Sequence, residues 1–324
     1  MRLEKPSDLL DPDALLKRPG ANLMVLAPHP DDESLATGGL IQRALGCGAE
    51  VSVVFASDGE NNPWPQRVLE RRAWIGPRQR AGWAARRRGE ADAALRMLGV
   101  DAAHVHRLGW PDGGITWMLL DDTAAMLATI RELVERERPT LLALPDLVDR
   151  HPDHSAIHVL MEMVFQTSPG LRKPDCLGYL LHGRSQPGVP QRAVFALSGD
   201  ERVRKRCAIE AHASQIALSR GRFLRFAAAT EDFVAGLDCH DRAAATLPWL
   251  PPRALRPFLA LLAVDAAGGE RVRPGGAGAN LFWRDGSPAA RTSRTLRPPY
   301  YVKLYCPLPS PWVFDGWGWC RFGA

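Results

Sequence analysis

The sequence lacks several features that would assign a protein to a class at once. Its 324 residues contain only six cysteines, and no two of them form a Cys-x-x-Cys pair, which argues against a zinc ribbon or a disulfide-rich scaffold. No stretch reaches the roughly 18 uninterrupted apolar residues of a membrane helix. Residues 1–20 are charged and lack the apolar core of a signal peptide. We therefore expect a cytoplasmic protein with reduced thiols and no membrane span.

A strong excess of one charge is also missing. The formal net charge is +5, from 41 Lys and Arg against 36 Asp and Glu. No basic run is interleaved with aromatic residues, so we expect no nucleic-acid partner. The composition, 46% hydrophobic and 24% charged, is ordinary for a globular protein. The length allows one large core and a smaller addition.

The most informative stretch begins with the apolar run Leu23–Ala27, which is typical of a strand buried on both faces. His29, Asp31, Asp32 and a glutamate follow it directly, and the spacing after them is helical. In an open α/β sheet, ligands bind at the carboxyl ends of the strands. So many ionisable groups at the tip of an apolar strand need a partner, and a divalent metal ion is the simplest one.

A second polar cluster follows a second buried-strand pattern, residues 140–145. It is His151-Pro-Asp-His154, and it opens another helical pattern. A catalytic zinc ion typically takes three protein ligands and leaves one position for water. His29 and Asp32 can hold one ion from two sides of a tight turn, and the second cluster would supply the third ligand if the two strands are neighbours. The alternative is that His29 caps a helix and the other two histidines lie in a surface loop.

Together, Pro28-His-Pro-Asp-Asp-Glu33 and the later His-Pro-Asp-His resemble the LmbE-like (PIG-L) family of zinc-dependent N-acetyl-sugar deacetylases. The resemblance implies that His29, Asp32 and His154 bind Zn²⁺ or another divalent transition metal. It implies that Asp31 is the general base. It also implies that His151 stabilises the developing oxyanion or the leaving amine.

The pattern along the chain predicts an α/β fold of the Rossmann-like type, a mostly parallel sheet sandwiched by helices. Strands are expected at 23–27, 50–59, 104–110, 140–145 and 177–183, and helices at 34–45, 78–100, 121–138, 155–165 and 201–216. The stretch 208–215 resembles a third, weaker signature of the family.

Residues 60–77 form a long loop in this prediction, and such loops are usually functional or disordered. The loop holds Asn61, Trp64 and Trp74. Polar groups and a tryptophan ring beside a metal site suit a sugar, so we expect Asn61 and Trp64 to contact the substrate. The alternative is that the tryptophan packs against its own loop.

Two further residues are implied in substrate binding by the resemblance. Arg87 lies in an Arg-x-x-Glu helix, and Asp112 lies in an Asp-Gly loop after the third strand. The alternatives are a solvated basic face for Arg87 and a plain turn for Asp112. Some family members have a catalytic tyrosine where this chain has Asp149, so that role must be absent here or filled by another residue.

We expect three parts: an N-terminal lead-in at 1–20, a deacetylase catalytic domain at 21–235, and a Pro- and Trp-rich extension at 236–324. Stretches 280–287 and 300–305 predict a hairpin and a strand in the extension. So many aromatic residues are not expected to stay solvated. We expect an irregular, partly β extension docked on the catalytic domain near the Trp64 loop.

The expected activity is hydrolysis of an N-acyl group, most simply acetyl, from an amino sugar or glycoconjugate. Zinc would lower the pKa of its water to about 7. Asp31 would take the proton and pass it to the leaving amine, and His151 would stabilise the oxyanion. An amidase for larger conjugates and a catalytically silent metal- or ligand-binding protein are the alternatives.

Overall fold

The computed structural model describes residues 11–183, 192–237, 241–242, 247–275, 280–284, 287–293, 295–308 and 313–323. These residues fall into two compact units, and the chain passes between them more than once. The first unit takes the described residues of Met1–Asp112, Glu137–Pro145 and Lys173–Cys239, and the second those of Gly113–Arg136, Asp146–Arg172 and His240–Ala324. Each unit is described by itself.

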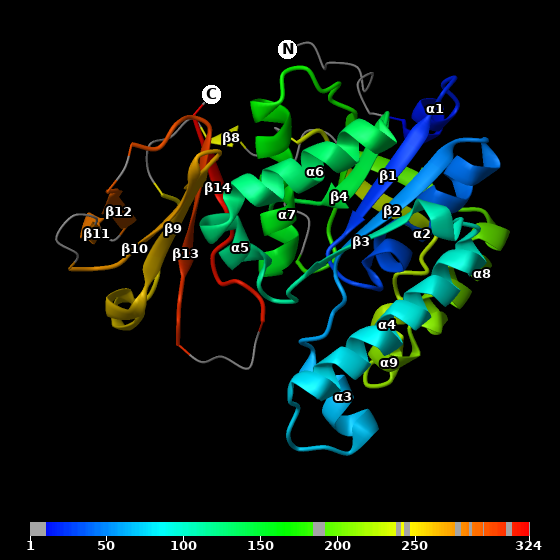
Figure 1. Ribbon diagram of the computed structural model, residues 1–324, viewed down its shortest axis with the longest axis horizontal. Helices are drawn as coiled ribbons and strands as arrows, with labels where there is room; N and C mark the ends of the chain where they lie inside the picture. Colours follow the sequence, from blue (N-terminus) through cyan, green and yellow to red (C-terminus); the bar gives the residue numbers. More distant parts are fainter. Residues whose placement is uncertain are drawn as a thin grey trace, which may run out of the picture. The chain divides into compact units, whose positions relative to one another are not determined.

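A seven-stranded sheet is the centre of the first unit (Figure 1), with the strand order β3-β2-β1-β4-β5-β7-β6. The strands are β1 (Asn22–Ala27), β2 (Glu50–Ser57), β3 (Val105–Trp110), β4 (Leu141–Pro145), β5 (Asp175–Tyr179), β6 (Arg192–Ala196) and β7 (Thr230–Ala235). The first five strands in this order are parallel, and β7 pairs antiparallel with both β5 and β6. The predicted α/β fold with a mostly parallel sheet is confirmed.

Strands β1 and β4 are neighbours, with Leu23 opposite Leu141 and Val25 opposite Ala143. All four side chains are fully buried or nearly so, as expected for strands covered on both faces. From β1 the chain continues to β2 on one side, while β4 lies on the other side. The strand order thus reverses between β1 and β4, and the carboxyl ends at such a switch point are where open α/β sheets bind ligands.

The helices of the first unit pack on this sheet and on one another. They are α1 (Pro12–Leu16), α2 (Asp32–Gly46), α3 (Pro63–Glu70), α4 (Pro77–Leu98), the 3₁₀ turn Ala102–His104, α8 (Gly199–Ala211), α9 (Ala213–Ile216) and α10 (Arg220–Leu224). Helix α2 packs on β1, β2 and α8, and α4 packs on α8. Gly99 ends α4 in the left-handed conformation, at φ +90°, which is the usual place of glycine at a helix end.

Several local predictions were wrong. The expected loop at 60–77 contains α3, which starts at Pro63, a residue favoured at the first helical position. The expected helix at 201–216 breaks at His212. Strand β6 and helix α5 were not predicted, and the third strand begins at Val105, because His104 belongs to a 3₁₀ turn.

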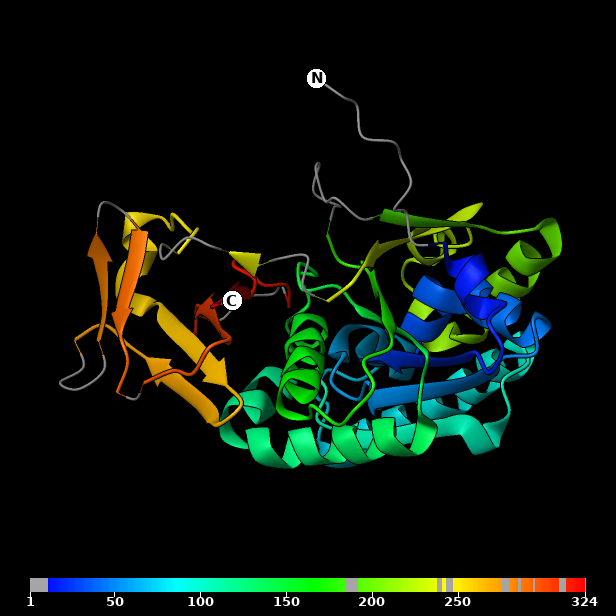
Figure 2. The same ribbon diagram turned by 90° about the horizontal axis from the view of Figure 1, so that it is seen from above.

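The second unit combines helices with a mostly antiparallel layer of strands, coloured yellow to red in Figure 2. Its helices are α5 (Ile115–Asp121), α6 (Thr123–Glu137, whose last residue belongs to the first unit), α7 (Pro152–Thr167) and the 3₁₀ turn Arg253–Phe258. One sheet has the order β10-β9-β13-β14-β8, and β11 pairs with β12 in a second. The strands are β8 (Asp241–Arg242), β9 (Ala260–Asp265), β10 (Gly268–Val272), β11 (Asn280–Arg284), β12 (Ser287–Arg291), β13 (Tyr300–Tyr305) and β14 (Cys320–Phe322).

The strand layer packs on α5 at very close range. A Cβ atom at Gly269 of β10 would lie 2.5 Å from the Cα atom of Leu120 in α5. The extension therefore has a more regular sheet than the sequence indicated, and it shares a core with helices that we assigned to the catalytic domain. The predicted strand at 300–305 is present as β13, and the predicted hairpin as β11 and β12. Its turn residues 285–286 lie outside the described part of the chain.

Two chemical expectations concern the whole chain. Among the described helices, none has both the length and the apolar character needed to cross a membrane. Among the described residues no disulfide joins two cysteines; the cysteines described are Cys47, Cys176, Cys207, Cys306 and Cys320.

Candidate active site

The turn between β1 and α2 carries the first motif in a strained conformation. Asp31 has φ 137°, which residues with a side chain rarely adopt. Its carbonyl accepts hydrogen bonds from the amides of Ser34 and Leu35, so it directly precedes the first turn of α2. Strained backbone of this kind persists only where its surroundings enforce it, and it is concentrated at functional sites.

His29 lies between two carboxylates. Its Nδ1 is 3.3 Å from Asp32 Oδ2, and its Nε2 is 3.1 Å from Asp112 Oδ1. The backbone N–H of His29 also donates to Asp32 Oδ2, at 2.8 Å. Burial raises the pKa of Asp112, but His29 outweighs it together with weaker partners, and the pKa of Asp112 falls below its usual value. The first motif thus joins the Asp112 loop in one buried polar cluster.

Asp31 is held by Arg87 from α4. Arg87 Nη2 lies 3.2 Å from Asp31 Oδ1, and the guanidinium also donates to the carbonyls of Pro30 and Gly59. Burial raises the pKa of Asp31 to about 6, although Arg87 acts in the opposite direction. Arg87 is only 3% exposed, so the alternative of a solvated basic face is wrong for this residue. A direct contact of Arg87 with substrate stays a prediction.

Glu33 and His212, for which no role was predicted, support the turn that carries Asp31. Glu33 Oε2 accepts the backbone N–H of Asp31 at 3.0 Å, and Glu33 Oε1 lies 3.0 Å from His212 Nε2. Burial lowers the pKa of His212, yet Glu33 and Asp31 outweigh it, so the pKa is raised. The signal in the sequence was the weak third signature at 208–215, where His212 interrupts the expected helix.

The segment 208–215 also contacts α4, the helix that carries Arg87. Ser214 donates to Glu90 through both its backbone N–H and its hydroxyl, at 3.0 and 2.6 Å. Glu90 is the acidic residue of the Arg-x-x-Glu pattern. The pattern therefore has a structural reason, because its arginine holds the turn after β1 while its glutamate holds the segment that carries His212.

Two of the residues predicted to contact the substrate, Asn61 and Asp112, are hydrogen-bonded to each other. The backbone N–H of Asn61 donates to Asp112 Oδ2 at 2.8 Å, and its amide side chain donates to the Asp112 carbonyl at 3.2 Å. Trp64 lies on α3 with 58% of its surface exposed, and the Arg67 guanidinium lies 5.3 Å from its ring centre. Contact of these residues with a sugar stays a prediction.

In the second unit, Asp149 organises the second motif. Its Oδ1 accepts the backbone N–H of His151 at 2.9 Å, and its Oδ2 lies 3.3 Å from His154 Nδ1. A carboxylate on one ring nitrogen of a histidine is the usual partner of a metal ligand, because it fixes the ring and its tautomer. Asp149 is 1% exposed. The residue that stands at the position of the tyrosine therefore contacts the His154 ring and holds the backbone of His151.

His151 begins α7 as its N-cap, and its Nδ1 accepts the backbone N–H of Asp153 at 3.3 Å. In a neutral imidazole this makes Nδ1 the acceptor and leaves the proton on Nε2. Asp153 in turn accepts the N–H groups of Gly113 and Ile115, at 2.7 and 3.1 Å. His151 caps α7, and His151 and His154 are both buried, so these histidines do not lie in a surface loop.

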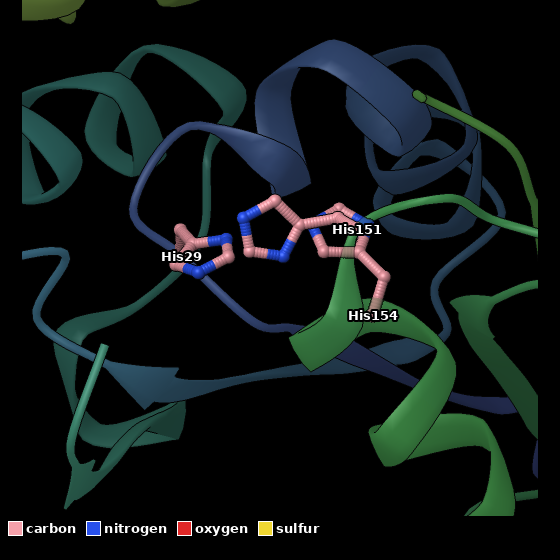
Figure 3. Close-up of side chains that lie close together, drawn as sticks. All are labelled: His29, His151 and His154. Atoms are coloured by element: carbon pink, nitrogen blue, oxygen red, sulfur yellow. The ribbon is translucent and has the colours of Figure 1, made fainter. Parts of the chain in front are cut away.

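One ligand atom from each of His29, His151 and His154 lies within 4.8 Å of the others, and Figure 3 shows the three rings close together. Two further groups meet the same criterion: Asp32 with His154 and His182, and His29 with Asp112 and Asp153. Imidazole nitrogens and carboxylate oxygens are the donors that zinc takes in catalytic sites. This His/Asp cluster can therefore bind a metal ion. The predicted trio does not form one of these groups by itself, so it stays a prediction.

Comparison with known proteins identifies the family. Residues 24–165 match the family model PIG-L, described as GlcNAc-PI de-N-acetylase. Over 228 residues the chain is 30% identical to the 1D-myo-inositol 2-acetamido-2-deoxy-alpha-D-glucopyranoside deacetylase of Tsukamurella paurometabola, covering 59% of this chain and 73% of that protein. The chain belongs to the PIG-L family.

Two further comparisons show how much of the chain is similar to known proteins. The deacetylase of the same name from Rhodococcus jostii is 31% identical over 176 residues, which span 48% of this chain and only 56% of that protein. The N,N'-diacetylchitobiose deacetylase of Pyrococcus horikoshii superposes with a TM-score of 0.56 at 20% identity, over 74% of this chain and 91% of that chain. The last comparison shows a shared fold.

Proposed function

We propose that the protein is a zinc-dependent hydrolase that removes an N-acyl group, acetyl in the simplest case, from an amino sugar or glycoconjugate. The observation that carries this proposal is the buried cluster in which His29 and Asp32 adjoin a strained Asp31. Membership of the PIG-L family supports it, as do the names of the relatives, which are deacetylases of a GlcNAc-containing compound.

His29, Asp32 and His154 would hold the metal ion, with Asp149 orienting His154 through Nδ1. A zinc ion in this position supplies a Lewis acid for water and for the amide carbonyl. The imidazole and carboxylate donors fit that ion. They would also accept other divalent transition metals.

Asp31 is the general base of the proposed reaction. It accepts the proton of the attacking water and delivers it to the leaving nitrogen. Its pKa of about 6 suits both halves of this task near neutral pH. Arg87 keeps the carboxylate oriented through the bond to Oδ1.

His151 is the oxyanion donor of the proposed reaction. Its Nδ1 accepts the Asp153 N–H, so Nε2 is the ring nitrogen that would donate to the oxyanion. A donor aimed at the developing negative charge is typically worth about 3 kcal/mol.

The proposal is tested by amine release from N-acetylglucosaminyl-inositol and from N-acetylglucosamine, with the metal content of the same sample measured. We expect turnover that is lost with a chelator and restored by zinc. Release from larger N-acyl conjugates alone would instead favour the amidase. A metal-loaded protein that hydrolyses none of these amides would contradict the proposal.

A further inference from the structure

The segment 313–315 of the C-terminal extension is fastened beside the second motif. The Asp315 carboxylate forms an ion pair with the Lys303 ammonium group of β13. Lys303 is 1% exposed, and its ammonium nitrogen lies 5.3 Å from the centre of the Trp319 ring. A buried lysine of this kind needs its carboxylate, because an unpaired buried charge is strongly unfavourable. The ion pair therefore fixes the segment to the strand layer.

The backbone of Asp315 fixes the same segment to the residue before His151. The Asp315 N–H donates to the Arg150 carbonyl at 2.7 Å, and the Asp315 carbonyl accepts Arg150 Nε at 3.3 Å. Arg150 is thus held through its main chain and its side chain at once. The start of α7 and the C-terminal segment form one connected piece.

This fastening brings Phe314 against the His151 ring. The two ring centres are 6.3 Å apart with an interplanar angle of 78°, which is the edge-to-face arrangement that aromatic rings prefer. On its other side, His151 has the His154 ring at 5.0 Å. Asp149 holds the backbone N–H of His151, the Asp153 N–H donates to its Nδ1, and Phe314 packs against its ring.

We propose that Phe314, anchored by Asp315, is a positioning residue for the His151 imidazole. The ring contact keeps His151 in the orientation in which Nδ1 faces the Asp153 N–H and the Nε2 proton faces the substrate carbonyl. This inference rests on the proposed function, in which His151 stabilises the oxyanion. It assigns to the C-terminal extension a part in catalysis in addition to its part in folding.

The test compares Phe314→Ala with Phe314→Tyr, which restores the ring edge. The control is Val313→Ala, an exposed neighbour. We expect Phe314→Ala to lower kcat roughly 10- to 100-fold, the scale of a misplaced catalytic group, with KM within about twofold. Phe314→Tyr should recover most of the loss, and Val313→Ala should match the parent protein. An unchanged kcat for Phe314→Ala would overturn the inference.

A second measurement does not need turnover. Side-chain nitrogen NMR of histidine-labelled protein, with the His151 signal assigned by its loss in His151→Ala, reports which ring nitrogen carries the proton. We expect the Nε2–H form in the parent protein and in Phe314→Tyr, and a mixture of tautomers in Phe314→Ala. Asp315→Asn should give a smaller change in the same direction. An identical His151 signal in all variants would overturn the inference, even if the parent protein proved inactive on every amide and the proposed function failed.

Discussion

At the scale of single residues, the two adjacent carboxylates of the first motif have different surroundings. Asp32 lies against His29, whereas Asp31 lies against Arg87 and has a pKa raised by burial. Such different surroundings would let one turn supply both a metal ligand and a base, as the proposed function requires. The two residues should therefore respond differently to substitution.

Replacing Asp31 by Asn should leave the metal content unchanged and lower kcat by about 10²- to 10⁴-fold, because the base is removed while the ligands stay. Metal analysis and steady-state kinetics on the same sample measure both quantities. Asp92→Asn, an exposed partner of Arg107, is the matched control and should be neutral. Near-normal turnover in Asp31→Asn would mean that another residue is the base.

His154→Ala should lose the metal, and Asp149→Ala should weaken zinc binding about 10- to 100-fold, as expected for the carboxylate behind a metal-bound histidine. A competition titration with a chromophoric chelator measures both affinities. Asp121→Ala, on the exposed end of α5, is the control for Asp149→Ala. Full metal occupancy in His154→Ala would rule out the assigned ligand set.

At the scale of elements, α4 delivers Arg87 to the turn after β1 only because residue 59 has no side chain. Gly59 has φ +66°, and a Cβ atom there would lie 1.7 Å from Arg87 Nη1. The close approach and the left-handed conformation both require glycine. The loop after β2 is therefore shaped around the arginine.

Gly59→Ala should displace Arg87 from Asp31 and reduce kcat at least tenfold, with a loss of stability of about 1 kcal/mol or more from the backbone conformation alone. Gly82→Ala is the control, since it lies inside α4 with nothing within 4 Å of the added atom. That change should raise stability by about 0.5–1 kcal/mol. Equal activity of Gly59→Ala and the parent would show that the Arg87 contact is dispensable.

Helix α2, which carries Asp32, is held against β7 by the Glu231 carboxylate, which also forms a buried ion pair with Lys205 of α8. Lys205 Nζ lies 2.6 Å from Glu231 Oε1, and the Glu231 carboxylate also accepts the N–H groups of Gly39 and Leu40. Both charged side chains are about 1% exposed. Removing one partner therefore leaves an uncompensated charge in the interior.

Lys205→Met should lower the free energy of unfolding by about 3–5 kcal/mol, and the double variant with Glu231→Gln should recover part of this loss. Urea denaturation followed by circular dichroism gives the values. The control is Arg204→Met, an exposed residue next to Lys205 on α8. It should change the free energy of unfolding by less than about 0.5 kcal/mol. If Lys205→Met were as stable as the parent protein, the Lys205–Glu231 ion pair would not stabilise the fold.

At the scale of the whole molecule, the C-terminal strands belong to the same unit as α5 and α7. Gly269 lies directly on Leu120, and Tyr301 of β13 accepts a hydrogen bond from Gln166 of α7, at 3.0 Å. The helix that begins at His151 therefore depends on residues after 235 for part of its packing. The boundary that we predicted at residue 235 stays a prediction.

Truncation after Ala235 should expose the faces of α5 and α7 that the strands cover, so we expect aggregation or a loss of cooperative unfolding. Light scattering and thermal unfolding of the purified fragment measure this. A Val194→Ser variant of the full chain, which changes one exposed apolar residue, controls for handling. A soluble fragment that binds metal and keeps its substrate preference would show that the extension is an independent module.

The sequence by itself determined the strands β1 and β4 and the two polar motifs that follow them. Continuous apolar runs and clustered ionisable groups are local signals, and they need no knowledge of distant contacts. Family membership followed from the same residues and is confirmed. Turns and short helices such as α3, α5 and the break at His212 were missed, since their local patterns are weak and tertiary contacts decide them.

Only the tertiary structure decided what surrounds each motif. Glu33 and His212 are 179 positions apart, and Arg150 and Asp315 are 165 apart, so no periodicity in the sequence can pair them. The sequence could not decide whether Arg87 lies in the site or on a solvated face, because a run of three arginines has the same pattern in both cases. Folding resolved it, since a buried guanidinium must find acceptors, and the turn at Asp31 and the loop at Gly59 supply them.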